Sequence, residues 1–132
     1  MDNLKITMPG KPEYFTMLRL AASALAAQAG FGLDDLDDIK VALTEACKSV
    51  SCHGCEAFSD RYEIEFNLAP QRMEITVIDA CEAHTIKKNG CMCPFHPIEG
   101  DIGTIMIRSL MNCVEIGVDK AGHKYVNMVK KI

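Results

Sequence analysis

Two alternating runs joined by a short turn constrain the fold of this chain more than any other feature. Residues 62–68 alternate apolar and polar side chains, and residues 73–77 do the same. Ala69-Pro70-Gln71 separates the two runs and is typical of a turn. Because successive side chains of a strand point to opposite faces, the pattern predicts an antiparallel hairpin with one buried face.

Further strands and helices are predicted from the spacing of apolar residues in the rest of the chain. Residues 3–8 alternate like a strand, and residues 114–118 and 125–129 predict a second hairpin around a turn. A first helix is predicted from Pro12 to a stop at Gly30, with these apolar residues at helical spacing: Tyr14, Leu18, Ala21, Ala22 and Leu25. A second helix is expected to have its N-cap at Asp34. A third, amphipathic helix is predicted from residues at helical spacing: Ile102, Ile105, Met106, Ser109, Leu110 and Cys113.

These elements predict one α+β domain, residues 1–132, built as a two-layer sandwich of helices and a sheet. A length of 132 residues and a hydrophobic content of 48% are those of one ordinary domain. The formal charge of −4 leaves no basic excess for direct nucleic-acid binding. The longest apolar run, residues 20–27, is far shorter than the ~20 residues of a membrane span, and the first residues lack a secretory signal. A cytoplasmic protein is therefore expected.

The second helix carries the polar residues that point most clearly to a site. Helical spacing places Glu45, Ser49 and Cys52 on one strip. The strip runs beside an apolar stripe that is expected to face the core, formed by Leu36, Ile39, Leu43, Ala46 and Val50. Polar residues at the border of a core-facing stripe predict the wall of a pocket.

Three motifs follow one another in the order of a known family. They are a helix containing Glu45-Ala46-Cys47, a strand ending in Val77-Ile78-Asp79, and the glycine pair Gly100 and Gly103 that opens a helix. With these motifs the chain resembles the anti-sigma-factor serine kinases of the Bergerat-fold, histidine-kinase-like ATPase superfamily. The resemblance implies a two-layer α/β sandwich whose mixed, mainly antiparallel sheet has its helices on one face.

The resemblance also implies roles for individual residues. Glu45 stands at the place of the family's general base, which activates the attacking hydroxyl. Ser49 stands where the family has an asparagine that helps to hold Mg²⁺, and it offers a hydroxyl oxygen on a shorter arm. Asp79 aligns with the aspartate that accepts a hydrogen bond from the adenine amino group. Cys81 stands where the family places a glycine close to the nucleotide.

The remaining nucleotide contacts are expected in the segment before the third helix. Gly100, Gly103 and Thr104 align with the family's turn, where backbone N–H groups suit phosphate binding, and residues 82–99 correspond to the lid over the nucleotide. The resemblance implies ATP and Mg²⁺ as cofactors, a sigma factor and an anti-sigma antagonist as partners, and a homodimer. Because two positions depart from the family's pattern, we expect a partly degenerate nucleotide site. A catalytically inactive protein-interaction module on the same fold is the alternative.

Seven cysteines form a separate set of candidates. In a chain without an export signal, an odd number of cysteines favours reduced thiols over a disulfide framework. Cys-x-x-Cys and Cys-x-Cys spacings could supply four thiolates to a tetrahedral Zn²⁺ or to a redox switch: Cys52, Cys55, Cys91 and Cys93, with His53 or His96 as alternates. Cys47 and Cys113 are expected to be small core residues. A metal or redox sensor is therefore a second alternative.

Overall fold

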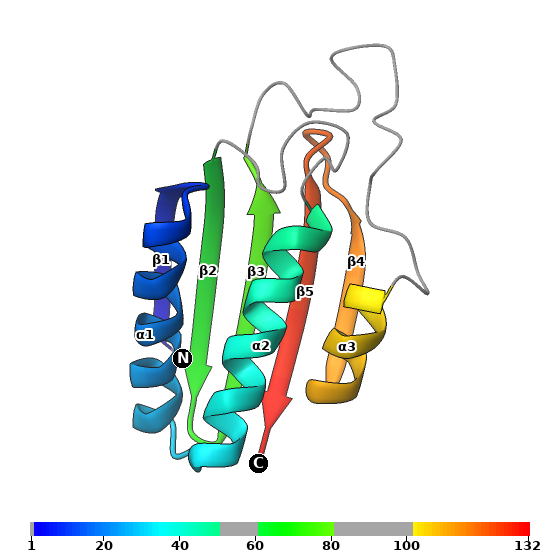
Figure 1. Ribbon diagram of the computed structural model, residues 1–132. Helices are drawn as coiled ribbons and strands as arrows, with labels where there is room; N and C mark the ends of the chain where they lie inside the picture. Colours follow the sequence, from blue (N-terminus) through cyan, green and yellow to red (C-terminus); the bar gives the residue numbers. More distant parts are fainter. Residues whose placement is uncertain (1, 51–60, 81–101) are drawn as a thin grey trace.

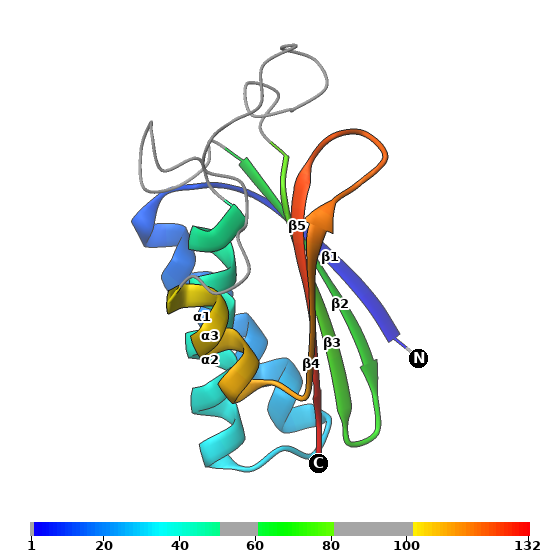
Figure 2. The same ribbon diagram turned by 90° about the vertical axis from the view of Figure 1, so that its right-hand side faces the viewer.

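The structure is a computed structural model that describes residues 2–50, 61–80 and 102–132. It consists of a five-stranded sheet with three helices (Figure 1), and Figure 2 shows that the helices lie on one face of the sheet. In chain order the elements are β1 (Asp2–Pro9), α1 (Pro12–Gln28), α2 (Leu33–Val50), β2 (Arg61–Ala69), β3 (Arg72–Asp79), α3 (Ile102–Leu110), β4 (Cys113–Val118) and β5 (Lys124–Lys131). The prediction of an α+β, two-layer sandwich is confirmed.

The strands lie in the order β1-β2-β3-β5-β4, and all four pairings between the described strands are antiparallel. Both predicted hairpins are present, since β2 pairs with β3 and β4 pairs with β5. The turn of the first hairpin carries Gln71 with a φ of 61°, a conformation that is uncommon for a residue other than glycine. Gln71 N–H donates to Ala29 O at 2.9 Å and Gln71 O accepts from Ile132 N–H at 3.1 Å, which holds the turn in place.

Helix α2 lies at the centre of the helical layer, over β3 and β5, with α1 and α3 packed on its two sides (Figure 1). Its predicted apolar stripe is confirmed, because Ile39, Leu43 and Ala46 are fully buried. The helix begins at Leu33, so Asp34 lies in the first turn and not at the N-cap. Among the described helices, none combines the length and the apolar character that crossing a membrane requires.

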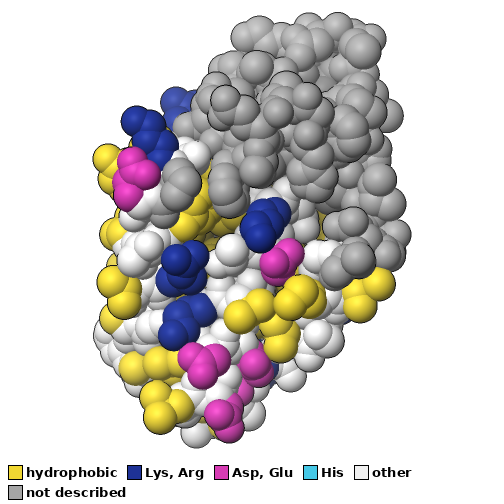
Figure 3. All heavy atoms as spheres, viewed as in Figure 1, with side chains coloured by type: hydrophobic (Ala, Val, Ile, Leu, Met, Phe, Trp, Pro, Cys, Tyr) yellow, Lys and Arg dark blue, Asp and Glu magenta, His cyan; other side chains and the backbone are white. Residues whose placement is uncertain are grey.

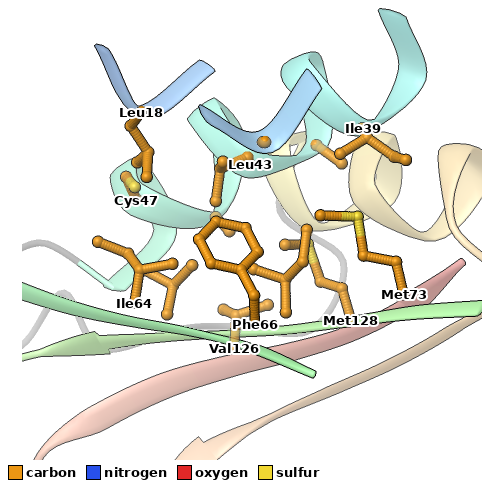
Figure 4. Packing of buried hydrophobic residues seen from close by; sticks show 14 of the residues in the cluster. Leu18, Ile39, Leu43, Cys47, Ile64, Phe66, Met73, Val126 and Met128 are labelled. Carbon is orange, nitrogen blue, oxygen red and sulfur yellow. The ribbon is translucent and has the colours of Figure 1, made fainter. Parts of the chain in front are cut away.

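The core lies between the helices and the inward face of the sheet. In Figure 4, Phe66 from the sheet points toward Leu43 from α2 within a cluster of buried apolar side chains. Phe15 of α1 packs edge-on against Tyr62 of β2, with ring centroids 5.7 Å apart and ring planes at 73°. Phe15 therefore faces the core in place of its neighbour Tyr14, which the helical spacing had favoured and which is 41% exposed.

Two predictions for the C-terminal part of the chain are wrong. Buried positions of α3 include Gly103, Thr104 and Ile107, whereas the predicted face residues Ile105 and Met106 are 57% and 39% exposed. This short helix has apolar residues on several sides, so packing against α2 selects the inward face. Cys113 begins β4 and is exposed, so it is not a core residue at the end of a helix.

Candidate functional site

Four polar or charged side chains are buried in the described part of the chain, and three of them, Ser49, Asp79 and Lys124, lie toward one end of the molecule. Ser49 is in the last turn of α2, Asp79 ends β3, Thr104 is in the first turn of α3, and Lys124 begins β5. In Figure 1 the corresponding ends of α2, β3 and β5 all point toward the top of the picture. We call this the site end. Because burying polar groups costs free energy unless they find partners, their concentration here marks a candidate site.

Asp79 occupies the position that the sequence predicts, at the end of a buried strand. It follows Val77 on the inward face and is 1% exposed. Its strand end is fixed through Arg61, whose backbone oxygen accepts from Ala80 N–H at 3.0 Å and whose guanidinium donates to Ala80 O at 3.2 Å. A carboxylate held inward at a fixed strand end is suited to accept hydrogen bonds from a ligand that lies over the sheet.

Ser49 and Glu45 lie one turn apart on α2 but differ in exposure. Ser49 is 6% exposed, whereas the Glu45 side chain is 22% exposed and forms an ion pair with Lys48, whose Nζ lies 3.7 Å from Glu45 Oε1. Tyr62 on β2 donates a buried hydrogen bond of 3.1 Å to the backbone oxygen of Cys47, which fixes the end of α2 over the sheet. Two members of the predicted strip therefore lie one turn apart, the serine buried and the glutamate near the surface, while the third, Cys52, lies outside the described residues.

Glu45 lines a groove of about 480 Å³ on the helical face. The other lining residues come from α1 and α2 and are Arg19, Asp37, Lys40, Val41 and Thr44. Figure 3 shows this face, on which basic and acidic side chains lie among apolar ones. A second hollow of about 380 Å³ lies around the turn between β2 and β3, at the opposite end of the sheet, and none of the predicted site residues lines it. The groove at Glu45 is therefore the hollow that bears on the candidate site.

The first turn of α3 carries two further predicted nucleotide-binding residues, Gly103 and Thr104. Both residues are buried, and α3 packs against α2. Backbone N–H groups in the first turn of a helix have no acceptor within the helix, so they suit an anionic ligand. Gly100 and Cys81, the other predicted nucleotide-binding residues, lie outside the described residues.

The predictions for the cysteines are tested only in part. Cys47 lies in the core as predicted, and burial raises the pKa of its thiol far above the usual range, so it stays protonated and unreactive. The predicted thiol cluster of Cys52, Cys55, Cys91 and Cys93 lies outside the described residues. In the parts of the chain that the structure describes, no group of three or more His, Cys, Asp or Glu side chains is arranged to hold a metal ion.

Lys124 belongs to the site end but was not among the predicted site residues. It is 0% exposed and occupies an inward position of β5, in line with Val126 and Met128. The strand predicted from the sequence starts at Tyr125, one residue too late to include it. A signal was present, because a lysine two residues before an inward valine continues the alternation of the strand.

Known proteins match this chain over nearly its whole length. A family model described as the histidine kinase-like ATPase domain matches residues 8–130. The serine-protein kinase RsbW of Bacillus licheniformis is 31% identical over 128 aligned residues, covering 89% of this chain and 80% of that protein. RsbW of Bacillus subtilis is 29% identical, covering 96% and 87%. RsbW of Halalkalibacterium halodurans is 32% identical, covering 89% and 77%.

A solved structure shares the arrangement of strands and helices. A chain in the crystal structure of the SiaB–SiaC complex from Pseudomonas aeruginosa matches with a TM-score of 0.57, covering 98% of this chain and 89% of that chain. Its sequence identity is 7%, so this likeness concerns the fold alone. Together with the family model, it agrees with a Bergerat-type sandwich.

Proposed function

Since this chain belongs to the histidine kinase-like ATPase superfamily and, within it, to the anti-sigma-factor serine kinases, we propose that it is an anti-sigma factor with protein kinase activity. It binds a sigma factor and transfers phosphate from ATP to a serine of an antagonist protein. Serine-protein kinase relatives at 31% and 32% identity support this proposal. We expect it to act in the cytoplasm as a homodimer.

The observation that carries the proposal is the collection of buried polar side chains at the site end. Asp79 has a carboxylate that can accept a hydrogen bond from the amino group of adenine. Ser49 can offer a hydroxyl oxygen to Mg²⁺, and the first turn of α3 at Gly103 and Thr104 can bind phosphate oxygens. These groups fit a magnesium-bound adenine nucleotide, which would supply the phosphoryl group.

Glu45 is the proposed general base for the substrate serine. Its side chain is partly exposed and lines the groove between α1 and α2, so a segment of a partner protein can reach it from solvent. A carboxylate within hydrogen-bond reach of the serine hydroxyl orients it and accepts its proton as the new oxygen–phosphorus bond forms.

A catalytically inactive protein-interaction module is the second candidate, and Ser49 is the observation that favours it. The family has an asparagine at this position, and the serine hydroxyl lies on a shorter arm in a side chain that is 6% exposed. Weaker coordination of Mg²⁺ would slow phosphoryl transfer without changing the groove at Glu45. Transfer of labelled phosphate from ATP to a candidate antagonist protein separates the two candidates, because ATP binding without labelling would favour the inactive module.

Replacement of Asp79 tests the nucleotide site. We expect Asp79→Asn to weaken ATP binding roughly ten- to a hundredfold, because it removes a charge-assisted hydrogen bond of about 1.5–3 kcal/mol. Calorimetric titration with Mg-ATP measures the affinity. Asp34→Asn is the matched control, because Asp34 is an exposed aspartate in the first turn of α2. Equal affinities of Asp79→Asn and the parent protein would contradict the assignment of the site.

A further inference from the structure

Lys124 is the most deeply buried charged side chain that the structure describes at the site end. Its exposure is 0%, and the next two inward residues of β5, Val126 and Met128, are also fully buried. Moving an ammonium group out of water is costly, so a lysine at this depth needs acceptors for its N–H groups. The proposed kinase chemistry gives this residue no role.

The register of the sheet places Lys124 opposite Asp79. Val77 pairs with Val126 across β3 and β5 on the inward face. Asp79 follows Val77 by two residues and Lys124 precedes Val126 by two residues, so the same register sets them in one row. Residues directly opposite on antiparallel strands have Cβ atoms about 4.5–5.5 Å apart. Asp79 and Lys124 therefore lie side by side on β3 and β5, which are neighbouring strands in Figure 1.

The third member of this row is tied to the helical layer. Tyr62 lies opposite Asp79 on β2, and its hydroxyl donates to the backbone oxygen of Cys47 at 3.1 Å. This hydrogen bond holds the end of α2 over the row. Across the sheet the row thus presents a tyrosine bound to the helix, then an acceptor at Asp79, then a donor at Lys124.

We propose that Lys124 reads the base of the bound nucleotide together with Asp79, an inference that rests on the nucleotide site proposed above. The amino group of adenine is a donor, and the ring nitrogens on either side of it, N1 and N7, are acceptors. An acceptor and a donor on neighbouring strands match such a pair of groups. Asp79 accepts from the amino group, and Lys124 donates to one of the adjacent ring nitrogens. Lys124 is then a residue that determines specificity for the base.

Deaza analogues of ATP test this contact at single atoms. In 1-deaza-ATP and 7-deaza-ATP a ring nitrogen is replaced by C–H, which cannot accept a hydrogen bond. In calorimetric titrations we expect the parent protein to bind one of the two analogues at least roughly tenfold more weakly than ATP. Lys124→Met keeps the length of the side chain and removes the donor. It should bind ATP at least roughly tenfold more weakly than the parent does, and it should bind ATP and both analogues equally.

Three controls distinguish reading of the base from a structural role. Lys131→Met makes the same change at an exposed position of β5 and should keep the parental ratio of affinities. Lys124→Gln keeps a donor without the charge and should retain part of the discrimination. Thermal unfolding shows whether each variant is folded, and a purely structural Lys124 would change the melting temperature but not the ratio between ATP and its analogues.

Two results would overturn the inference while leaving the proposed function intact. The first is equal binding of ATP and both analogues by the parent protein, a measurement that does not depend on whether any variant folds. The second is a Lys124→Met variant that still distinguishes ATP from the analogues as the parent does. Absence of ATP binding by the parent would instead overturn the proposed kinase and this inference together.

Discussion

Two lysines on the inward face of β5 show how the two ends of this molecule differ. Lys130 lies at the end opposite the candidate site, where its Nζ is 3.8 Å from an Asp35 oxygen and 3.4 Å from an Asp38 oxygen and donates to the backbone oxygen of Leu110. Lys124 begins the same strand, at the site end, and is fully buried. The first lysine joins parts of the fold, whereas the second lies where a nucleotide is proposed to bind.

The partners of Lys130 are two carboxylates of α2 and the C-terminal end of α3, and both kinds of group favour a cation. Asp35 and Asp38 lie near the start of α2, and Leu110 is the last residue of α3, where backbone carbonyl groups lack helical partners and carry the negative end of the helix dipole. Lys130 therefore ties α2, α3 and β5 together. At the site end, the buried residues Ser49, Asp79 and Lys124 lie where a nucleotide is proposed to bind. Two lysines on the same face of one strand can thus differ in role, one stabilising the fold and the other marking a ligand site.

Variants that remove the charged side chains at each end test this comparison, and we expect the largest loss of stability for the variant at Lys130. Lys130→Met is expected to lower the free energy of unfolding by about 1–3 kcal/mol, because it removes a charge-assisted hydrogen bond and two ion pairs that water partly screens. The double variant Asp79→Asn/Lys124→Met removes both buried charges together and should change the same quantity by less than about 1 kcal/mol. Urea denaturation measures both. A double variant that loses more stability than Lys130→Met would show that the site end is structural.

A variant of Ser49 that binds the nucleotide more tightly would sharpen the comparison of the two ends, because it would mark the site end as a ligand site. Ser49→Asn, alone and with Cys81→Gly, restores the residues that the family has at these positions. We expect several-fold tighter binding of Mg-ATP, with the dependence on Mg²⁺ arising mainly from position 49. Titration with and without Mg²⁺ measures this gain, and Ser109→Asn on the exposed side of α3 is the control. If the parent already binds Mg-ATP with micromolar affinity and the double variant binds no better, the site is not degenerate.

The smallest effect is expected at Tyr125, which follows Lys124 but lies on the outward face of the sheet. Its hydroxyl donates to Glu115 at 2.6 Å, and this hydrogen bond raises the pKa of Tyr125, followed by desolvation and the charges of Glu115 and Asp119. Because the folded state favours the protonated phenol, the stabilisation is present below about pH 10 and is lost as the pH rises through the raised pKa.

As the pH rises above about 10, the free energy of unfolding of Tyr125→Phe should therefore fall less than that of the parent protein. The difference should be small because the group is exposed to solvent. Urea denaturation at several pH values measures it, and nucleotide affinity at neutral pH should be unchanged. If Tyr125→Phe and the parent protein lose the same free energy of unfolding at alkaline pH, the hydrogen bond to Glu115 does not contribute to stability.

Local patterns in the sequence were sufficient for much of the fold and for part of the site. The alternation in residues 62–77 predicted the central hairpin, and helical spacing predicted the buried stripe of α2 that contains Leu43. The place of Asp79 at a buried strand end followed from the same alternation. These predictions succeed because the strand period of two and the helix period of 3.6 are set by backbone geometry, which determines the residues that share a face.

Packing between distant segments decided the rest. The inward face of α3 was not predictable from spacing, because this short helix is apolar on several sides and contact with α2 selects one of them. The alternation of β5 places Lys124 on the inward face, but it does not specify which strand lies beside it. Only the insertion of β5 between β3 and β4 sets Lys124 opposite Asp79, because strand order is determined by how the whole sheet packs under its helices.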